Sequence, residues 1–196
     1  MAPVGKLTTF RVLLAEAAQR GMDVDFLDIR SAYLTADLDI PQHMTPPKGV
    51  EPPRPGHVML LEKGLYGLRQ GARLFHEKFK KDLKAWGFRS GSGDPCLYVK
   101  QDGDNQIRIL LFVDDLAIFS DSTEGGKALK ADLKAKIESK YEYSTGHDEH
   151  VYLGMAIHRI NKNQIFLTQS RYIEDVMIRF GFNECRSVKT PSTGAK

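Results

Sequence analysis

The chain has few cysteines, one tryptophan and no long apolar run, and these shortages exclude several classes of protein. Its 196 residues include two cysteines, Cys96 and Cys185. Two thiols form neither a disulfide framework nor, by themselves, a thiolate metal site. No window of about 18 apolar residues is present, so no membrane-spanning helix and no membrane partner are expected. The first ten residues lack the apolar core of a secretory signal, which favours an intracellular protein.

The rest of the composition is that of an ordinary globular domain. Hydrophobic residues make up 41% and charged residues 27%, which argues against disorder and collagen-like repeats. The length fits one domain with a proper core. The net charge is only +3, but residues 23–39 and 102–121 each carry five aspartates against one arginine. Two acidic clusters in a basic chain fit a cation site beside a surface that binds a polyanion, and solvated surface patches are the simpler alternative.

Four segments have the apolar spacing of amphipathic helices. In the clearest one, Phe75, Phe79 and Leu83 share a single face. Gly21 stands where the first helix should stop, and Ser122 or Thr123 is placed to cap the third. The predicted helices are 7–20, 74–86, 123–141 and 170–180.

Runs of β-branched and aromatic residues between turn signals predict the strands. These are 24–29, 58–61, 97–100, 107–113, 116–120, 151–160 and 164–167. The stretch 41–56 holds six of the nine prolines, so we predict an extended surface loop there. Helices interleaved with hairpins predict the α+β class, with an antiparallel sheet packed on helices.

The most informative segment is 107–120, a near-continuous apolar run interrupted by Asp114 and Asp115. Strands this apolar are buried on both faces, where two adjacent carboxylates would repel each other. A tight hairpin turn places both acids at its tip, although it lacks the Gly or Asn that such turns prefer. We therefore expect backbone strain at Val113 or Asp114, and a local rule broken at a charged turn indicates function. A solvated turn that holds two acids fits the local sequence equally well.

A third carboxylate favours the functional interpretation. Asp28 lies near the end of the apolar strand 24–29. One acid on a strand end and two on a neighbouring hairpin suit a pair of divalent ions about 3.5–4 Å apart. Oxygen ligands alone select Mg²⁺ or Mn²⁺. Such a pair activates a 3′-hydroxyl and stabilises a leaving pyrophosphate, so we expect the three carboxylates to converge.

Short motifs spread over nearly the whole chain make the pattern specific. They are APV (2–4), FLDIRSAYL (26–34), LYGLRQ (65–70), DPCLY (94–98), FVDD (112–115), YLG (152–154) and QSRYI (169–173) with FG (180–181). In this order and spacing, the set resembles the reverse transcriptase of copia-type LTR retrotransposons.

The resemblance implies an RNA-directed DNA polymerase that transfers a nucleotide from a dNTP to a primer 3′-hydroxyl. Its fold is a palm with part of the fingers, expected over residues 1–182, and residues 183–196 begin a connection to further parts. By matching motifs, the catalytic metal ligands are Asp28, Asp114 and Asp115, with the backbone carbonyl of Ile29 as an additional ligand. Two Mg²⁺ or Mn²⁺ ions are the implied cofactors.

The resemblance also assigns contacts to the incoming nucleotide. Tyr33 falls where the family places the aromatic that packs under the sugar and excludes a 2′-hydroxyl, and a core tyrosine is the alternative. Gln70 falls where a glutamine contacts the nucleotide, and Arg73 is placed to touch the triphosphate or the template. A plain loop residue and an exposed basic residue are the corresponding alternatives.

Two further motifs are expected to contact primer and template. Residues Leu153, Gly154 and Met155 belong to a segment that resembles the hairpin that grips the primer end, for which an ordinary hairpin is the alternative. Phe112 and Val113 precede the paired aspartates on the same turn. Phe112 stands where tyrosine is common, which removes a hydroxyl near the primer without changing a metal ligand.

The implied partners are an RNA or DNA template with its primer, a dNTP, and the RNase H and integrase parts of a Pol polyprotein. The implied location is a cytoplasmic virus-like particle or the nucleus. Against the family's pattern, the outer fingers and a complete thumb are expected to be missing from these 196 residues, so weak template binding and poor or no extension are expected. The alternative function is a truncated, inactive retrotransposon remnant that acts at most as a nucleic-acid-binding module.

Overall fold

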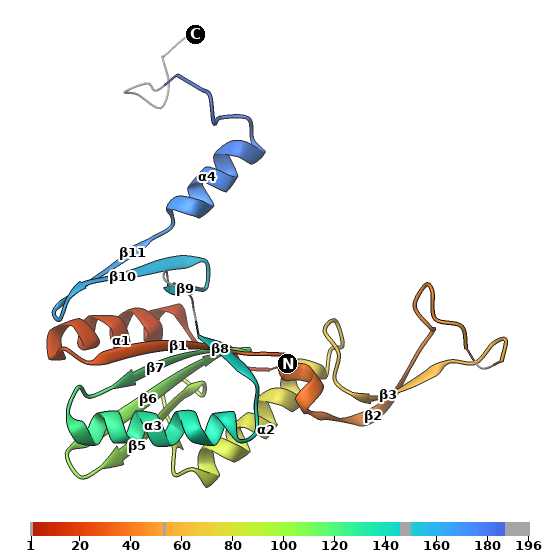
Figure 1. Cartoon of the computed structure of the whole chain (residues 1–196), viewed down its shortest axis with the longest axis horizontal. Helices are drawn as coiled ribbons and strands as arrows, with labels where there is room; N and C mark the ends of the chain where they lie inside the picture. The colour runs from red at the N-terminus through yellow and green to blue at the C-terminus, as the bar shows by residue number, and fades with distance from the viewer. Residues whose placement is uncertain (1, 53, 146–149, 187–196) are drawn as a thin grey trace.

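Six antiparallel strands form the central sheet of the computed structural model, which describes residues 2–52, 54–145 and 150–186 (Figure 1). The strands are β1 (Asp23–Ile29), β4 (Arg89–Ser90), β5 (Leu97–Asp102), β6 (Asn105–Phe112), β7 (Asp115–Ser120) and β8 (Tyr143–Thr145). Their order across the sheet is β4-β5-β6-β7-β1-β8. The four strands predicted between residues 24 and 120 in this sheet are confirmed to within two residues at each end, and so is the α+β class.

The described residues contain four α-helices, as predicted. They are α1 (Leu7–Arg20), α2 (Gly71–Ala85), α3 (Glu124–Glu138) and α4 (Ser170–Arg179). The predicted stop of α1 is confirmed, because Gly21 takes a left-handed φ of 64° and caps the helix. The side chain of Thr123 accepts a hydrogen bond from the backbone N–H of Gly126 at 3.0 Å, which confirms the predicted cap of α3.

The two faces of the central sheet carry different partners. Side chains alternate along β1, so Phe26 points to one face while Asp23 and Asp25 point to the other. The ring of Phe26 packs against Phe10 of α1 with centroids 6.3 Å apart. On the opposite face, Lys130 of α3 forms ion pairs with Asp23 and Asp25. The sheet is therefore held between α1 and α3.

The predicted apolar face of α2 lies in the core. Phe75, Phe79 and Leu83 are each at most 1% exposed. The ring of Phe79 meets Tyr141, just beyond α3, with centroids 5.3 Å apart. This aromatic contact fixes α2 beside α3, on the face of the sheet opposite α1.

A second, three-stranded sheet lies against α1 (Figure 1). It consists of β9 (His150–Tyr152), β10 (Met155–Asn161) and β11 (Gln164–Thr168), in the order β11-β10-β9. The single strand predicted over 151–160 is wrong, because a turn at Leu153 and Gly154 divides it. Both turn residues take positive φ values, 54° and 73°. The signal for this turn was the glycine itself, which adopts such angles without a steric penalty.

Part of the predicted proline-rich loop is a strand. The loop was expected over 41–56, but Pro41–Met44 belongs to β2 (Asp37–Met44), which pairs with β3 (Met59–Lys63). Among the described residues β2 has β3 as its only strand neighbour, and the register shifts between Asp37 and Gln42. An irregular edge strand tolerates proline. Figure 1 shows this ribbon projecting from the body, and a short 3₁₀ helix at Ala32–Thr35 leads into it.

The last helix extends away from both sheets (Figure 1). None of the residues of α4 is buried, and Tyr172, Ile173 and Ile178 are more than half exposed. Of the connection expected at 183–196, residues 187–196 lie outside the described part of the chain.

The structure also describes the two cysteines and the length and polarity of the helices. Cys96 is buried and Cys185 is exposed, and both are free thiols. Over residues 2–52, 54–145 and 150–186, no helix is long and apolar enough to cross a membrane.

Candidate active site

The paired aspartates lie at the tip of the β6–β7 hairpin. Phe112 pairs with Asp115, so Val113 and Asp114 form a two-residue turn. Val113 takes a φ of 62°, which confirms the predicted strain at this turn. Positive φ in a β-branched residue costs of order 1–3 kcal/mol, and such strain persists only where the surrounding structure imposes it. Here the apolar strands on both sides fix the turn.

The third aspartate meets this hairpin through the sheet. The antiparallel register places Asp28 of β1 directly opposite Asp115 of β7. The backbone N–H of Ile29 donates a hydrogen bond to the carbonyl of Asp114 at 3.0 Å. Residues directly opposite on adjacent strands have Cβ atoms about 4.5–5.5 Å apart. The structure thus brings the three acids, and Ile29, to one corner of the sheet.

The electrostatics of this corner fit a divalent cation. Burial and, to a smaller extent, the negative charges of Asp114 and Asp28 together raise the pKa of Asp115 to about 6. A bound cation relieves such like-charge repulsion, and carboxylate oxygens are the ligands that Mg²⁺ and Mn²⁺ prefer. Within the part of the chain that the structure describes, no three His, Cys, Asp or Glu side chains are grouped tightly enough to form a ligand set. The acids are neighbours that a cation would have to draw together.

Tyr66 contacts this corner, and no role had been assigned to it from the sequence. Its hydroxyl donates a hydrogen bond to Oδ2 of Asp114 at 3.2 Å. Its ring lies against Tyr33, with centroids 4.4 Å apart. Burial raises the pKa of both tyrosines, and the negative charge of Asp114 adds to the shift. The only local signal was the position of Tyr66 within the LYGLRQ motif.

Two glycines allow the backbone around Tyr33 to approach closely. A Cβ added to Gly64 would lie 2.7 Å from the carbonyl oxygen of Tyr33. A Cβ on Gly71 would lie 3.6 Å from Cγ of Tyr33 and 3.2 Å from the Leu65 carbonyl oxygen. The partly buried Tyr33 ring is therefore held between the start of α2 and Tyr66, next to the aspartate corner.

Gln70 and Arg73, the other two residues predicted to contact the nucleotide, contact β2 in this structure. The side-chain amide of Gln70 donates a hydrogen bond to the carbonyl of Ile40 at 3.0 Å. Arg73 forms an ion pair with Asp39, and a second one with Glu77 at 3.1 Å. Both side chains therefore tie the start of α2 to the β2–β3 ribbon. Their contact with a nucleotide stays a prediction.

The predicted primer hairpin borders the same corner. Tyr152 of β9 is 1% exposed, and its ring lies 4.7 Å from Phe10 and 5.2 Å from Phe26. A cavity of about 350 Å³ is lined by Asp28, Asp115 and Tyr152, together with neighbouring residues of β1, β8 and β9. The turn that follows carries Leu153 and Gly154, and Met155 is buried. The structure thus places β9 beside two of the three acids.

Comparison with known proteins identifies the family of this chain. The family profile described as "Reverse transcriptase (RNA-dependent DNA polymerase)" matches residues 1–194. The "Retrovirus-related Pol polyprotein from transposon TNT 1-94" of Nicotiana tabacum is 34% identical over 196 residues, which cover 98% of this chain and 14% of that protein.

Two proteins of Arabidopsis thaliana are similar as well. The Pol polyproteins from transposons RE2 and RE1 are 31% and 29% identical over 191 residues, which cover 97% of this chain and 13% of each relative. The chain thus spans about one seventh of the length of these relatives. Because the family profile covers nearly all of it, the chain belongs to the reverse transcriptase family, among the Pol polyproteins of copia-type retrotransposons.

Proposed function

We propose that this chain is the nucleotide-adding domain of an RNA-directed DNA polymerase. The six-stranded sheet and its helices are the palm, and the β2–β3 ribbon belongs to a partial fingers subdomain. In this proposal the domain covers residues 1–182 and residues 183–196 begin a connection to further parts, while the RNase H and integrase parts of a Pol polyprotein are its partners. The observation that carries this proposal is the register that sets Asp28 opposite Asp115, next to Asp114.

In this proposal the carboxylates of Asp28, Asp114 and Asp115, with the carbonyl of Ile29, hold Mg²⁺ or Mn²⁺. Two such ions, when bound, activate a primer 3′-hydroxyl and stabilise the leaving pyrophosphate. The protein's own part is to fix the acids on a strained turn and on the strand paired with it, so that a cation has only to draw neighbouring side chains together. The hydrogen bond from Tyr66 orients Asp114 in the free protein.

The substrates follow from the surroundings of the acids. We propose that Tyr33 forms the floor under the sugar of a dNTP, with Gln70 and Arg73 nearer the phosphates and the template. Phe112, Val113, Leu153, Gly154 and Met155 contact the primer and template strands. The shared cavity supports this arrangement, because Val151 and Tyr152 of β9 line it together with Asp28 and Asp115.

Single-nucleotide addition tests this function. The purified chain, in excess over a primed RNA template at low salt, is given one complementary dNTP with Mg²⁺ or Mn²⁺. We expect template-directed addition of that nucleotide, and none with a mismatched dNTP. Template binding without any addition under both metals would contradict the proposal and favour an inactive nucleic-acid-binding module.

Replacing Tyr33 with valine should weaken discrimination against ribonucleotides. The ring of Tyr33 would occupy the space of a ribose 2′-hydroxyl, so selection comes from exclusion rather than from a hydrogen bond. We expect the ratio of ribonucleotide to deoxynucleotide addition to rise by at least about tenfold, because a single methylene more or less in a pocket changes selectivity by roughly 10–200-fold. Competition between ATP and dATP opposite one template uridine measures the ratio. An unchanged ratio would reject this role.

The raised pKa of Asp115 predicts that the free energy of unfolding depends on pH. Its pKa is about 6 in the folded protein against about 3.9 when unfolded, so the folded state holds more protons between these values. The stability from this group is therefore greatest at low pH and falls as pH rises through about 6.

Asp115→Asn removes this titration. In metal-free buffer we expect the variant to be more stable than the wild type at about pH 7.5, by ~1–2 kcal/mol after discounting for solvent screening. At about pH 4 the difference should disappear, because Asp115 is then largely neutral in the wild type. Urea unfolding at both pH values measures it, and a gap that is the same at both would contradict the shift.

A further inference from the structure

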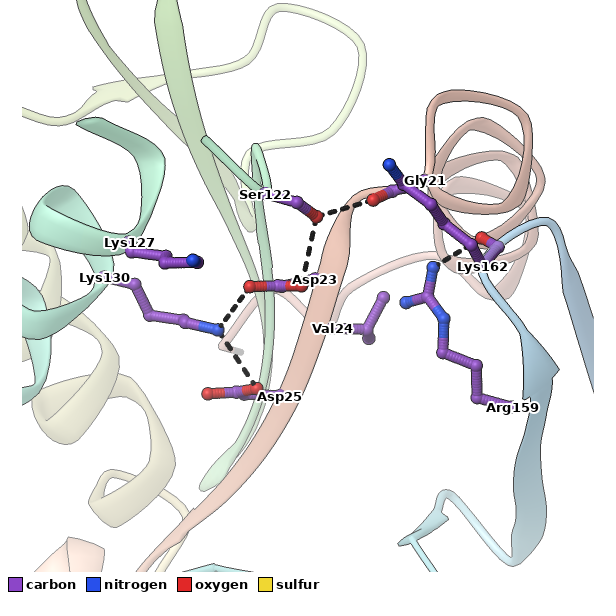
Figure 2. A pocket seen from close by; sticks show the side chains of 9 residues that line it. All are labelled: Gly21, Asp23, Val24, Asp25, Ser122, Lys127, Lys130, Arg159 and Lys162. Carbon is purple, nitrogen blue, oxygen red and sulfur yellow. Dashed lines mark hydrogen bonds and ion pairs between the residues drawn. The ribbon is translucent and has the colours of Figure 1, made fainter. Parts of the chain in front are cut away.

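A second, cationic cavity lies at the end of β1 opposite the aspartate corner. It has a volume of about 580 Å³ and is lined by residues of the α1–β1 junction, α3 and the β10–β11 hairpin (Figure 2). Asp23, which lines it, precedes Asp28 by five residues on the same strand. At about 3.3 Å per residue, the two sites are ~17 Å apart along β1. The cavity is thus separate from the proposed catalytic carboxylates.

The cavity exists because part of β1 is a sheet edge. β8 pairs only with Leu27–Ile29, so in the described ranges the first half of β1 has a strand neighbour only in β7. The α3 helix forms one wall beside this edge, and the β10–β11 hairpin forms the other (Figure 2).

The lysines on the wall formed by α3 already form ion pairs with carboxylates. Lys130 contacts Asp23 at 3.0 Å and Asp25 at 3.6 Å, and Lys127 contacts Glu124 at 2.8 Å. The hydrogen bond and the charge of Lys130 lower the pKa of Asp23 despite its burial. Both aspartates of the cavity are therefore occupied by lysines and do not oppose a further anion strongly.

The opposite wall carries Arg159, whose positive charge acts on Asp23 only from a distance and helps to lower the pKa of that carboxyl. The guanidinium of Arg159 donates hydrogen bonds to the backbone carbonyls of Met22 at 2.5 Å, Lys162 at 2.7 Å and Asn161 at 3.3 Å. Among the described residues it has no acidic partner within ion-pair distance. A guanidinium has five N–H donors, so about two of them remain for a ligand.

Lys162 adds a second unpaired cation. In the described part of the chain its ammonium group forms no ion pair, while its side chain lies over Gly21, where an added Cβ would be 2.4 Å from Cε. The cavity is lined by four cations, Lys127, Lys130, Arg159 and Lys162, and by two carboxylates. The difference is a net charge of +2 among the lining residues, and the arginine on the β10–β11 wall is held by three backbone carbonyls.

We propose that this cavity is a phosphate-binding site. The free N–H donors of Arg159 form charge-assisted hydrogen bonds to phosphate oxygens, which suit the planar fork of arginine. Lys162 supplies further charge from the same wall, and Lys127 lines the cavity from α3 while it remains paired with Glu124. The phosphate belongs either to the backbone of a nucleic acid or to a free nucleotide or polyphosphate. The site requires no metal and is independent of the proposed polymerase chemistry.

Calorimetric titration with tripolyphosphate in EDTA tests the site. Without metal the aspartate corner is anionic and repels phosphate, so the titration reports on the cavity. The test variant is Lys127→Ala with Lys162→Ala, which leaves the Lys130–Asp23 pair intact. The control is Lys81→Ala with Lys84→Ala, an exposed pair on α2 with the same change in charge. Equal melting temperatures establish that both variants are folded.

We expect the test variant to bind tripolyphosphate at least about tenfold more weakly, with a smaller salt dependence, and the control to bind as the wild type does. Arg159→Lys, which keeps the charge but loses the fork, should also weaken binding. The same titrations with a single-stranded oligonucleotide identify the source of the phosphate. If the test variant loses affinity for tripolyphosphate alone, the ligand of the cavity is a free polyphosphate. If it also loses affinity for the oligonucleotide, the ligand is the nucleic-acid backbone. Equal loss in the test and control variants, or loss in neither, would overturn the proposal.

Discussion

Replacing Asp114 with asparagine is expected to abolish single-nucleotide addition and to leave the fold intact. Asparagine keeps the shape and an oxygen that accepts the hydrogen bond from Tyr66, but it removes one of three negative charges. Loss of one positioned group that stabilises the transferring phosphoryl typically costs ~10²–10³ in rate, and loss of a metal ligand at least as much. The unfolding free energy should stay the same or rise, because Asp115 loses a repulsive neighbour.

Asp102→Asn is the matched control for this experiment. Asp102 is an exposed residue at the end of β5, and its replacement makes the same change in charge. It should keep the wild-type rate. If Asp114→Asn retained addition, or if Asp102→Asn lost as much, Asp114 would not be a catalytic residue.

Replacing Phe10 with alanine should give the largest loss of stability among these variants. Phe10 is fully buried, and its ring contacts Phe26 of β1 and Tyr152 of β9. It thus packs α1 against both the central sheet and the predicted primer hairpin. Truncating a buried phenylalanine to alanine costs about 3–5 kcal/mol, since the lost apolar contacts are compounded by a cavity.

Urea unfolding compares this variant with Phe182→Ala. The side chain of Phe182 is 57% exposed, so its truncation should change stability by no more than about 0.5 kcal/mol. A loss below about 1 kcal/mol for Phe10→Ala would show that the three-ring cluster does not hold β9 in place.

Local patterns predicted the features that depend on neighbouring residues. Gly21 was expected to end α1, and Ser122 or Thr123 to cap α3, where Thr123 is the cap. Two acids in an apolar hairpin without glycine indicated strain at Val113 or Asp114, and Val113 carries it. Each of these depends on a few consecutive residues and their intrinsic conformational preferences. The α+β class followed from the order of the elements alone.

Features that depend on distant partners were missed. The hydrogen bond from Tyr66 joins residues 48 positions apart, and the Lys130–Asp23 pair spans 107. Neither leaves a periodic signal in the sequence. The extension of β2 through Pro41 was missed for a related reason, because only the paired structure shows that this strand lies at an edge.

Manganese binding tests most directly whether the three aspartates form one metal site. Electron paramagnetic resonance measures the concentration of free Mn²⁺ as the metal is titrated into each protein. The proteins compared are the wild type, the three site variants Asp28→Asn, Asp114→Asn and Asp115→Asn, and the control Asp102→Asn. We expect the wild type and the control to bind Mn²⁺ alike, and each of the three site variants to bind at least about tenfold more weakly, because each removes a carboxylate ligand. Wild-type affinity in any one of the three variants would contradict a shared site.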